Sequence, residues 1–159
     1  MTDGRLAEAV SHGHALADYV RSLEFMRREK DQAFREDPGS PLPAALRDRF
    51  AGLAYFPADP AYRVRVRLVR YPEGSRVTLA TSKGIPREMV RYGYFEFPIG
   101  GATVRLDAFK SVPEPGHRHG PESLFVPFRD ATSGKESYGA ARYLDVEESP
   151  DDEYVLDFN

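Results

Sequence analysis

The sequence predicts a mainly β protein (α+β) in which one long N-terminal helix precedes an antiparallel sheet of six or seven strands, curled into a barrel or sandwich. Two observations carry this prediction. Apolar residues recur at helical steps before residue 40 and at every second residue after residue 60. Short strands at such spacing, without helices between them, indicate antiparallel pairing. The chain of 159 residues, 41% of them apolar, is long enough to bury one core.

A helix is expected over residues 5–36. Its apolar residues lie three and four apart on one stripe: Leu16, Val20, Leu23, Met26 and then Ala33 or Phe34. The segment Asp37-Pro38-Gly39 ends the helix, because proline disfavours helical geometry in the residue before it. We therefore expect residues 1–43 to form the helix and a linker, and residues 44–159 to form the antiparallel β domain, within a single structural domain.

Strands are expected where apolar and polar residues alternate. In the first of them, Val64 and Val66 share one face and three arginines share the other. The expected strands cover residues 62–68, 76–79, 89–97, 104–108, 123–128, 140–147 and 154–158. Pro72–Ser75 has the composition of a turn, and Gly100-Gly101 suits a tight hairpin turn.

Composition excludes several kinds of chemistry. The chain has no cysteine, so it can form no disulfide, thiolate nucleophile or cysteine zinc site. No apolar run approaches the ~20 residues of a membrane-spanning helix, and the N-terminus lacks the apolar region of a secretory signal. We therefore expect a soluble, cytoplasmic protein without a membrane partner.

Charge is distributed unevenly along the chain. Residues 60–110 carry ten basic and four acidic residues, whereas residues 144–159 carry seven acidic and no basic residues. A positive sheet face with aromatic neighbours would suit single-stranded nucleic acid. Its members would be Arg63, Arg65, Arg67, Arg76 and Arg105, with Tyr92, Tyr94 and Phe95. The net charge of −3 and the pI of about 5.8 favour the alternatives. These are a solvent-exposed face, or arginines that pair across strands with Glu96 and Asp107, and the acidic terminal segment is a further candidate to cover this face. We therefore expect no nucleic-acid partner.

The densest polar segment is residues 129–143. It lies between two expected strands, in a loop longer than the usual hairpin connection. The candidate ligand-binding residues are Arg129, Asp130, Thr132, Ser133, Lys135, Glu136, Tyr138, Arg142 and Tyr143. Their guanidinium, ammonium and hydroxyl donors suit a carboxylate or a phosphate, so the first hypothesis is a binding module for a small anionic ligand. The alternative for the loop is that the four charged residues between 129 and 136 pair with one another.

An enzyme is the second hypothesis, with Asp130 or Glu136 as acid and base and Lys135 stabilising a developing anion. Which residues would be catalytic stays unknown at this point. Ser133-Gly134-Lys135 invites comparison with a phosphate-binding loop. That motif needs glycine where Arg129 stands, and serine or threonine where Glu136 stands. A nucleotide triphosphatase of that type is therefore excluded, and a protein-interaction module with a purely structural loop is the third hypothesis.

Two histidine pairs are candidate metal ligands. His117 and His119 are two apart in a loop rich in proline and glycine, and two such residues on an extended chain point the same way. His12 and His14 have the same spacing, but in a helix it does not place both on one face. No spacing identifies a third ligand. We therefore expect no metal site and no cofactor.

Seven segments of the chain together carry a family resemblance. They are Arg28–Asp31 with Phe34, Ser40–Leu42, Phe50–Pro57, Tyr62–Val64, Phe125–Gly139, Arg142–Asp145 and Val155–Asn159. With these segments the chain resembles the bacterial and archaeal family known as domain of unknown function 1684. The resemblance implies that the family's signature lies in residues 129–143, and it implies no activity. It also implies that a C-terminal segment is missing here, which would leave an exposed strand edge at 154–158 and favour a homo-oligomer.

Overall fold

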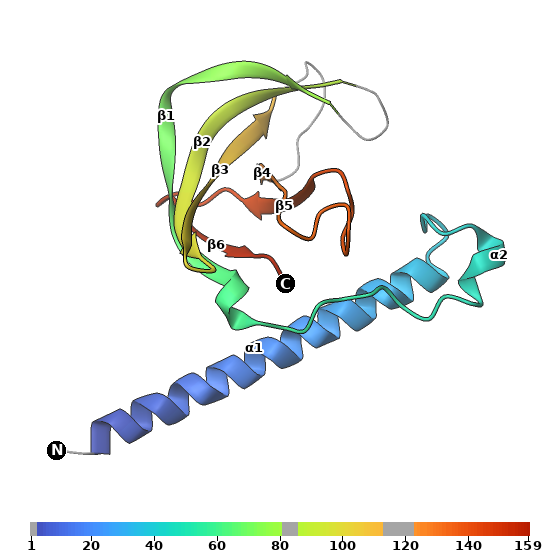
Figure 1. Ribbon diagram of the computed structural model, residues 1–159, viewed down its shortest axis with the longest axis horizontal. Helices are drawn as coiled ribbons and strands as arrows, with labels where there is room; N and C mark the ends of the chain where they lie inside the picture. The colour runs from blue at the N-terminus through green and yellow to red at the C-terminus, as the bar shows by residue number, and fades with distance from the viewer. Residues whose placement is uncertain (1–2, 81–85, 113–122) are drawn as a thin grey trace. The chain divides into compact units, whose positions relative to one another are not determined.

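The computed structural model describes residues 3–80, 86–112 and 123–159, with side chains from residue 14 onward. The elements are α1 (Asp3–Glu36), α2 (Ala44–Arg47), the 3-10 turn η1 (Pro60–Tyr62), β1 (Arg63–Leu79), β2 (Arg87–Ile99), β3 (Ala102–Ser111), β4 (Ser123–Phe128), β5 (Arg142–Glu147) and β6 (Glu153–Asp157). They form two compact units, one of residues 1–60 with Asn159 and one of residues 61–158. The predicted fold class is confirmed: an N-terminal helix is followed by a six-stranded antiparallel sheet that is nearly closed into a barrel (Figure 1).

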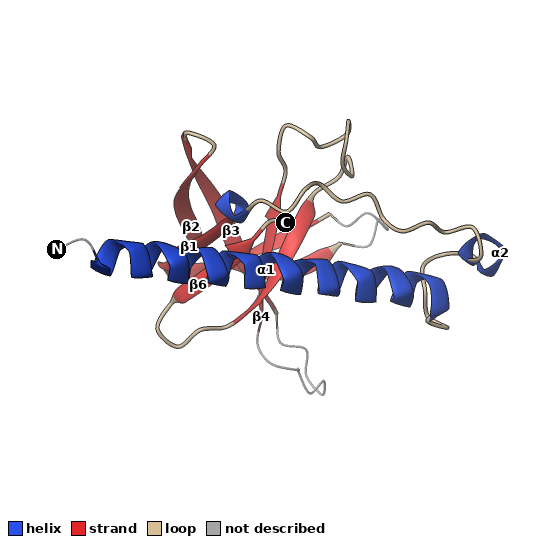
Figure 2. Ribbon diagram, turned by 90° about the horizontal axis from the view of Figure 1, so that it is seen from below, coloured by secondary structure: helices blue, strands red, loops and turns tan. Residues whose placement is uncertain are grey.

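The first unit consists of α1 and the segment that returns along it. Figure 2 shows α1 as one uninterrupted helix. The helix ends at Glu36, next to the predicted stop, where the amide of Gly39 donates to Oδ1 of Asp37 at 2.6 Å. The aromatic rings of Phe34 and Phe50 then stack with their centroids 5.9 Å apart, which fixes the returning segment against the last turns of the helix.

Asp31 is the main polar anchor within this unit. One oxygen of its carboxylate accepts from the amide of Leu53 at 3.1 Å and from the hydroxyl of Tyr55 at 3.0 Å. Partial burial, with the Asp31 hydrogen bond and charge, raises the pKa of Tyr55 to about 12. Arg27 lies over the Tyr55 ring at 4.8 Å and donates to the carbonyl of Phe56 at 2.9 Å. The helix and the returning segment are therefore joined by a network of contacts that all lie within the first unit.

The second unit is the sheet, whose strands lie in the order β5-β4-β3-β2-β1-β6. The hairpin β2–β3 turns at Gly100 and Gly101, as the sequence predicts, and both glycines have positive φ. The turn expected at Pro72–Ser75 is absent: β1 runs continuously from Arg63 to Leu79, with an irregularity in its pairing to β2 between Arg70 and Ser75. A β-bulge uses the same residue types as a turn and bends the strand without ending it.

Apolar side chains fill the concave side of the sheet. Those with no exposed surface are Phe95, Ala108, Leu124, Val126 and Leu156. The ring of Tyr154 from β6 packs edge-on against Phe95 from β2, with centroids 5.2 Å apart. The inward alternation of β1 predicted from the sequence is confirmed, since Val66 and Leu68 are buried while the arginines beside them are exposed. The barrel interior is therefore a packed core, and no polar or charged side chain is buried there among the residues that the structure describes.

Candidate functional site

The loop between β4 and β5 is organised around one carbonyl group. The oxygen of Thr132 accepts from the amides of Lys135, Glu136 and Ser137 at 3.0, 3.0 and 3.1 Å. The side-chain hydroxyl of Thr132 lies 2.8 Å from the hydroxyl of Ser137. The backbone can turn this tightly because Gly134 has a φ of 82°, a conformation that favours glycine. The loop is therefore folded by bonds between residues that are close in sequence.

Asp130 anchors the start of this loop. Its carboxylate accepts from the amide of Thr132 at 2.9 Å and from the Thr132 hydroxyl at 2.6 Å, and it forms an ion pair with Arg142. The Asp130 amide in turn donates to the hydroxyl of Ser133 at 3.1 Å. Partial burial alone would raise the pKa of Asp130, but the Thr132 hydrogen bonds and the Arg142 charge outweigh it and lower that pKa below its ordinary value. Asp130 is held as a carboxylate.

Arg142 and Tyr143 begin β5 and face different surroundings. The guanidinium of Arg142 lies 4.9 Å from the centre of the Phe128 ring, and its buried Nε has no hydrogen-bond partner among the described residues. Tyr143 stands over Phe125, with the ring centroids 5.0 Å apart, yet 57% of Tyr143 is exposed. Arg142 therefore holds the loop, whereas Tyr143 presents a ring to solvent.

The predicted site residues fall into two groups. The structure brings together Asp130, Thr132, Ser133 and Arg142 in one hydrogen-bonded network. The side chains of the others stay outside that network, and these residues are exposed: Arg129, Lys135, Glu136, Tyr138 and Tyr143. Within the described residues, the side chains of Arg129, Lys135 and Glu136 make no hydrogen bond or ion pair. Asp130 thus pairs with Arg142 from the next strand and not with the cations of its own loop.

A second polar cluster, which sequence reasoning missed, lies at the other end of β5. The turn at residues 148–152 follows β5, and its Glu148 binds Lys110 of β3 with both oxygens at 2.7 Å. Glu148 also accepts from the hydroxyl of Tyr92 at 3.1 Å. Asp152 of the same turn binds Arg70 of β1, with an N–O distance of 2.7 Å. No local pattern marks this cluster, because the residues of its three pairs stand 38, 56 and 82 positions apart in the sequence.

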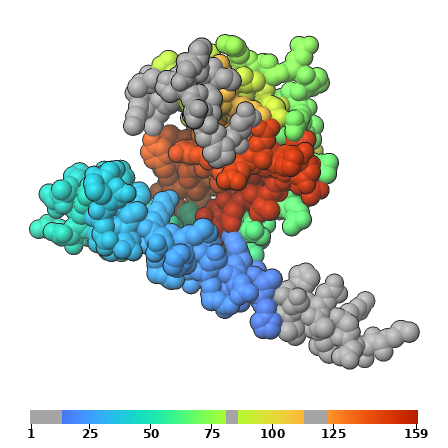
Figure 3. Space-filling model, turned by 180° about the vertical axis from the view of Figure 1, so that it is seen from behind, coloured from blue at the N-terminus to red at the C-terminus, as the bar shows by residue number. Residues whose placement is uncertain are grey.

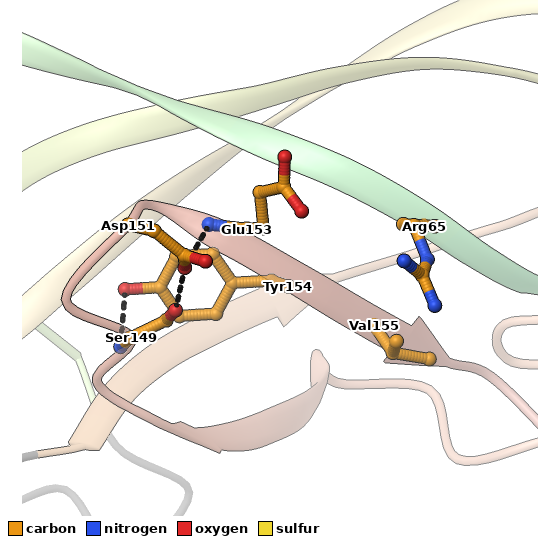
Figure 4. A pocket seen from close by; sticks show the side chains of 6 residues that line it. All are labelled: Arg65, Ser149, Asp151, Glu153, Tyr154 and Val155. Atoms are coloured by element: carbon orange, nitrogen blue, oxygen red, sulfur yellow. Dashed lines mark hydrogen bonds between the residues drawn. The ribbon is translucent and has the colours of Figure 1, made fainter.

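A pocket of about 260 Å³ lies on the outside of the barrel beside β6. It is lined by Arg65, Ser149, Asp151, Glu153, Tyr154 and Val155 (Figure 4). None of these residues belongs to the predicted loop, and among them only Arg65 was singled out by the sequence. The other five lining residues lie in the acidic run of residues 144–159, which is the sequence feature that could have indicated them. The last strand of that run, β6, lies opposite the arginines of β1.

Two arginines of the outward face of β1 pair with carboxylates of the acidic C-terminal strand, and not with Glu96 or Asp107. Arg63 pairs with Asp157 at 3.7 Å and Arg67 with Glu153 at 3.1 Å. Farther along the sheet, Arg105 lies 3.6 Å from the centre of the Tyr94 ring. Two of the outward arginines are therefore neutralised by the acidic C-terminal strand.

In the part of the chain that the structure describes, no group of three or more histidine, aspartate or glutamate side chains is placed to hold a metal ion. His117 and His119 lie outside the described residues, as does the side chain of His12. Neither helix, within the residues described, combines the length and apolar character needed to cross a membrane.

No curated protein matches the chain. Among solved structures, the chain is similar to an uncharacterised protein of Haloarcula marismortui determined by solution NMR, with 35% identity and a TM-score of 0.64 over 92% of this chain and 78% of that one. The family model described as "Protein of unknown function (DUF1684)" matches residues 48–159. Neither match confirms that a C-terminal segment is missing. Because the family match covers more than half of its length, the chain belongs to the DUF1684 family.

Proposed function

We propose that the protein is a binding module for a small anionic ligand, with its site on the surface of the loop at residues 129–143. Arg129 and Lys135 would bind the anionic group, and Tyr138 and Tyr143 would flank it. The proposal also takes the protein to be cytoplasmic, without nucleic-acid or membrane partners, in keeping with its net negative charge and its lack of cysteine.

The observation that carries this proposal is the contrast between paired and unpaired charges on one ordered loop. Asp130 is already matched by Arg142. Arg129 and Lys135 are exposed and have no carboxylate partner in the described part of the chain. A loop whose backbone is fixed by its own hydrogen bonds loses little conformational freedom when it binds a ligand. Two such cations on a rigid loop favour an anion, as in other charge-assisted sites.

The enzyme hypothesis receives less support from the same geometry. A general acid or base works best when its pKa lies near the working pH. The pKa of Asp130 is instead lowered, and both its oxygens are occupied by Thr132 and Arg142. Asp130 is therefore suited to holding the loop. Among the described residues, the Glu136 side chain makes no hydrogen bond or ion pair that would position it as a general base.

A protein-interaction module is the second candidate, and one observation favours it. Tyr138 and Tyr143 are 59% and 57% exposed. Exposed tyrosine rings of this kind often anchor protein interfaces. The two candidates differ in the residues they need. Ligand binding depends on the charges of Arg129 and Lys135, with the tyrosine rings beside the ligand, whereas an interface depends on the tyrosine rings and does not need the two charges.

The test is a thermal-shift titration with inorganic phosphate, acetate and citrate as probes. The wild-type protein should be stabilised in a saturable manner by at least one of them, because a ligand that binds only the folded state raises the unfolding temperature. Arg129→Ala and Lys135→Ala should remove the stabilisation. Arg76→Ala is the matched control, since Arg76 is an exposed arginine on β1 outside the loop.

Equal responses from wild type, both loop variants and the control would sink the anion-binding proposal. The same outcome, together with a partner that loses affinity when Tyr138→Ala is introduced, would favour the interaction module. If both loop variants lose the response and the control keeps it, the anion site stands.

A further inference from the structure

Tyr143 lies on the outer face of the β4–β5 pair. The side chains of these strands that pack in the core are Leu124 and Val126 on β4 and Leu144 on β5. Side chains alternate along a strand, so Phe125 and Tyr143 point outward, and their ring centroids lie 5.0 Å apart. More than half of Tyr143 nevertheless stays exposed. Phe125 therefore covers one side of the tyrosine ring, and the rest of the ring is open to solvent.

Arg129 belongs to the same outer face, although β4 ends one residue before it. Phe128 and Asp130, its two neighbours in the sequence, both contact the guanidinium of Arg142. Because they reach the same partner, these two neighbours share one face of the chain, and the residue between them points to the other face. Arg129 is exposed and makes no ion pair or hydrogen bond with any described residue. Its free charge therefore lies on the face that carries Tyr143.

The strand register sets the order of these side chains along the outer face. Tyr143 is the direct partner of Pro127, and Phe125 and Arg129 stand two residues before and two residues after that proline. Such diagonal neighbours lie about 7–8 Å apart, within reach of aromatic and long side chains. Phe125 and Arg129 therefore flank Tyr143 on opposite sides. Asp145 is the direct partner of Phe125, so the row has a carboxylate at one end and a guanidinium at the other.

We propose that the ligand of the loop at residues 129–143 is an aromatic carboxylate, whose ring lies against the open side of Tyr143 and whose carboxylate binds Arg129. The inference rests on the proposed function, because Arg129 is a cation of that site, and it adds the chemical class of the ligand. Contacting carbon atoms lie about 3.5–4.0 Å apart, so a spacing of about 7–8 Å admits one flat group between the two side chains. Asp145 disfavours a second negative charge at the far end of the ligand.

The test is a titration of the full chain followed by the backbone amide signals in NMR spectra. Acetate carries the carboxylate alone, cyclohexanecarboxylate adds a bulky apolar ring, and benzoate adds a flat aromatic ring, all with the same charge. Benzoate should shift the amide signals of Arg129 and Tyr143 in a saturable manner. It should bind about fivefold more tightly than the other two carboxylates, because only its ring can stack on a tyrosine.

Three variants and one control locate the ring and the carboxylate. Tyr143→Leu should weaken benzoate binding about fivefold and leave acetate binding unchanged, whereas Tyr143→Phe should bind both like wild type. Arg129→Gln should weaken the binding of both carboxylates about tenfold, because it removes a charge-assisted contact. Tyr62→Leu is the control, since Tyr62 is an exposed tyrosine outside the loop. Retained dispersion of the amide signals shows that a variant is folded.

The outcomes separate this inference from the proposed function. Benzoate binding that is no tighter than that of cyclohexanecarboxylate, or that is unchanged in folded Tyr143→Leu, overturns the aromatic ligand. The anion site still stands in that case if acetate binding is lost in Arg129→Gln. Binding of inorganic phosphate or citrate without benzoate has the same meaning. If none of these anions shifts the signals of the loop, the proposed function fails and this inference fails with it.

Discussion

The two connections that flank β5 are held by opposite kinds of contact. The loop before β5, residues 129–141, is held by bonds within itself and to Arg142, the first residue of the strand. The turn after β5, residues 148–152, is held by side chains of three other strands, through Lys110, Tyr92 and Arg70. In Figure 3 the chain from β4 to the C-terminus, orange to red, forms one continuous stretch of the surface of the second unit.

Because of this difference, the order of the β4–β5 loop and the stability of the barrel depend on separate sets of contacts. We expect the loop to loosen with little effect on the barrel, because most of its bonds join residues no more than five positions apart and its tie to a strand is the ion pair of Asp130 with Arg142. The turn cannot loosen without affecting β1, because the amide of Leu68 in that strand donates to the carbonyl of Asp152 at 2.8 Å. The β5–β6 turn is therefore part of what closes the barrel, and the β4–β5 loop is not.

Glu148→Gln should have the largest effect on stability. The carboxylate of Glu148 and the ammonium group of Lys110 are only 23% and 22% exposed, so removing one charge leaves the other poorly solvated. We expect a loss of about 2 kcal/mol in the free energy of unfolding, measured by urea denaturation.

Glu147→Gln is the matched control, because Glu147 is an exposed glutamate at the end of the same strand. Its replacement should change the free energy of unfolding by less than about 0.5 kcal/mol. Equal effects of the two substitutions would show that the β5–β6 turn does not couple to the other strands, and the contrast between the two connections would be lost.

Gly134→Ala should have a smaller effect, confined to the loop. The positive φ of Gly134 is unfavourable for alanine, and we expect a cost of at most about 1 kcal/mol in the free energy of unfolding. Gly139→Ala is the control, because Gly139 lacks a positive φ and an added Cβ would lie 3.4 Å from the nearest atom, in ordinary contact. Amide NMR signals should change within residues 129–141 for the first variant and leave Glu148 and Asp152 unchanged. Changes at the turn would contradict the independence of the two connections.

The same contrast explains which features could be predicted from the sequence. Alternation places the side chains of a strand on its two faces, so the sheet and the buried face of β1 were predictable. The helix was predictable from apolar residues three and four positions apart. Pro72–Ser75 was misread as a turn, because proline, glycine and serine suit a bulge within a strand as well as the end of one. Propensity reports the local conformation of the backbone. It does not report whether the next residues resume the same pairing.

The candidate site was predictable to the extent that its contacts are local. The ties of Asp130 to Thr132 and Arg142 lie within twelve residues, so the polar loop was visible as a dense segment. Arg65 differs from Arg63 and Arg67 because the register of β1 with β6 places it opposite Val155 and not opposite a carboxylate. Register between strands nearly ninety residues apart is decided by the whole sheet, and no spacing in the sequence reports it.

The smallest predicted effect concerns the protonation of Asp130. Its pKa is lowered in the folded state, so the stabilisation it supplies is complete above the ordinary aspartate pKa of about 3.9 and is lost as pH falls through the lower, folded value. Because the side chain is 47% exposed, we expect well under 1 kcal/mol in global stability. The titration should instead appear in the amide signal of Thr132, with a midpoint below 3.9.

Arg142→Gln tests the cause of that low midpoint. Removing the guanidinium should move the Thr132 midpoint upward, because the opposite charge no longer favours the carboxylate. A Thr132 midpoint that stays in place without Arg142 would assign the lowered pKa to Thr132 alone. The loop would then be independent of β5 as well as of the β5–β6 turn, and the first residue of that strand would be free to contact a ligand.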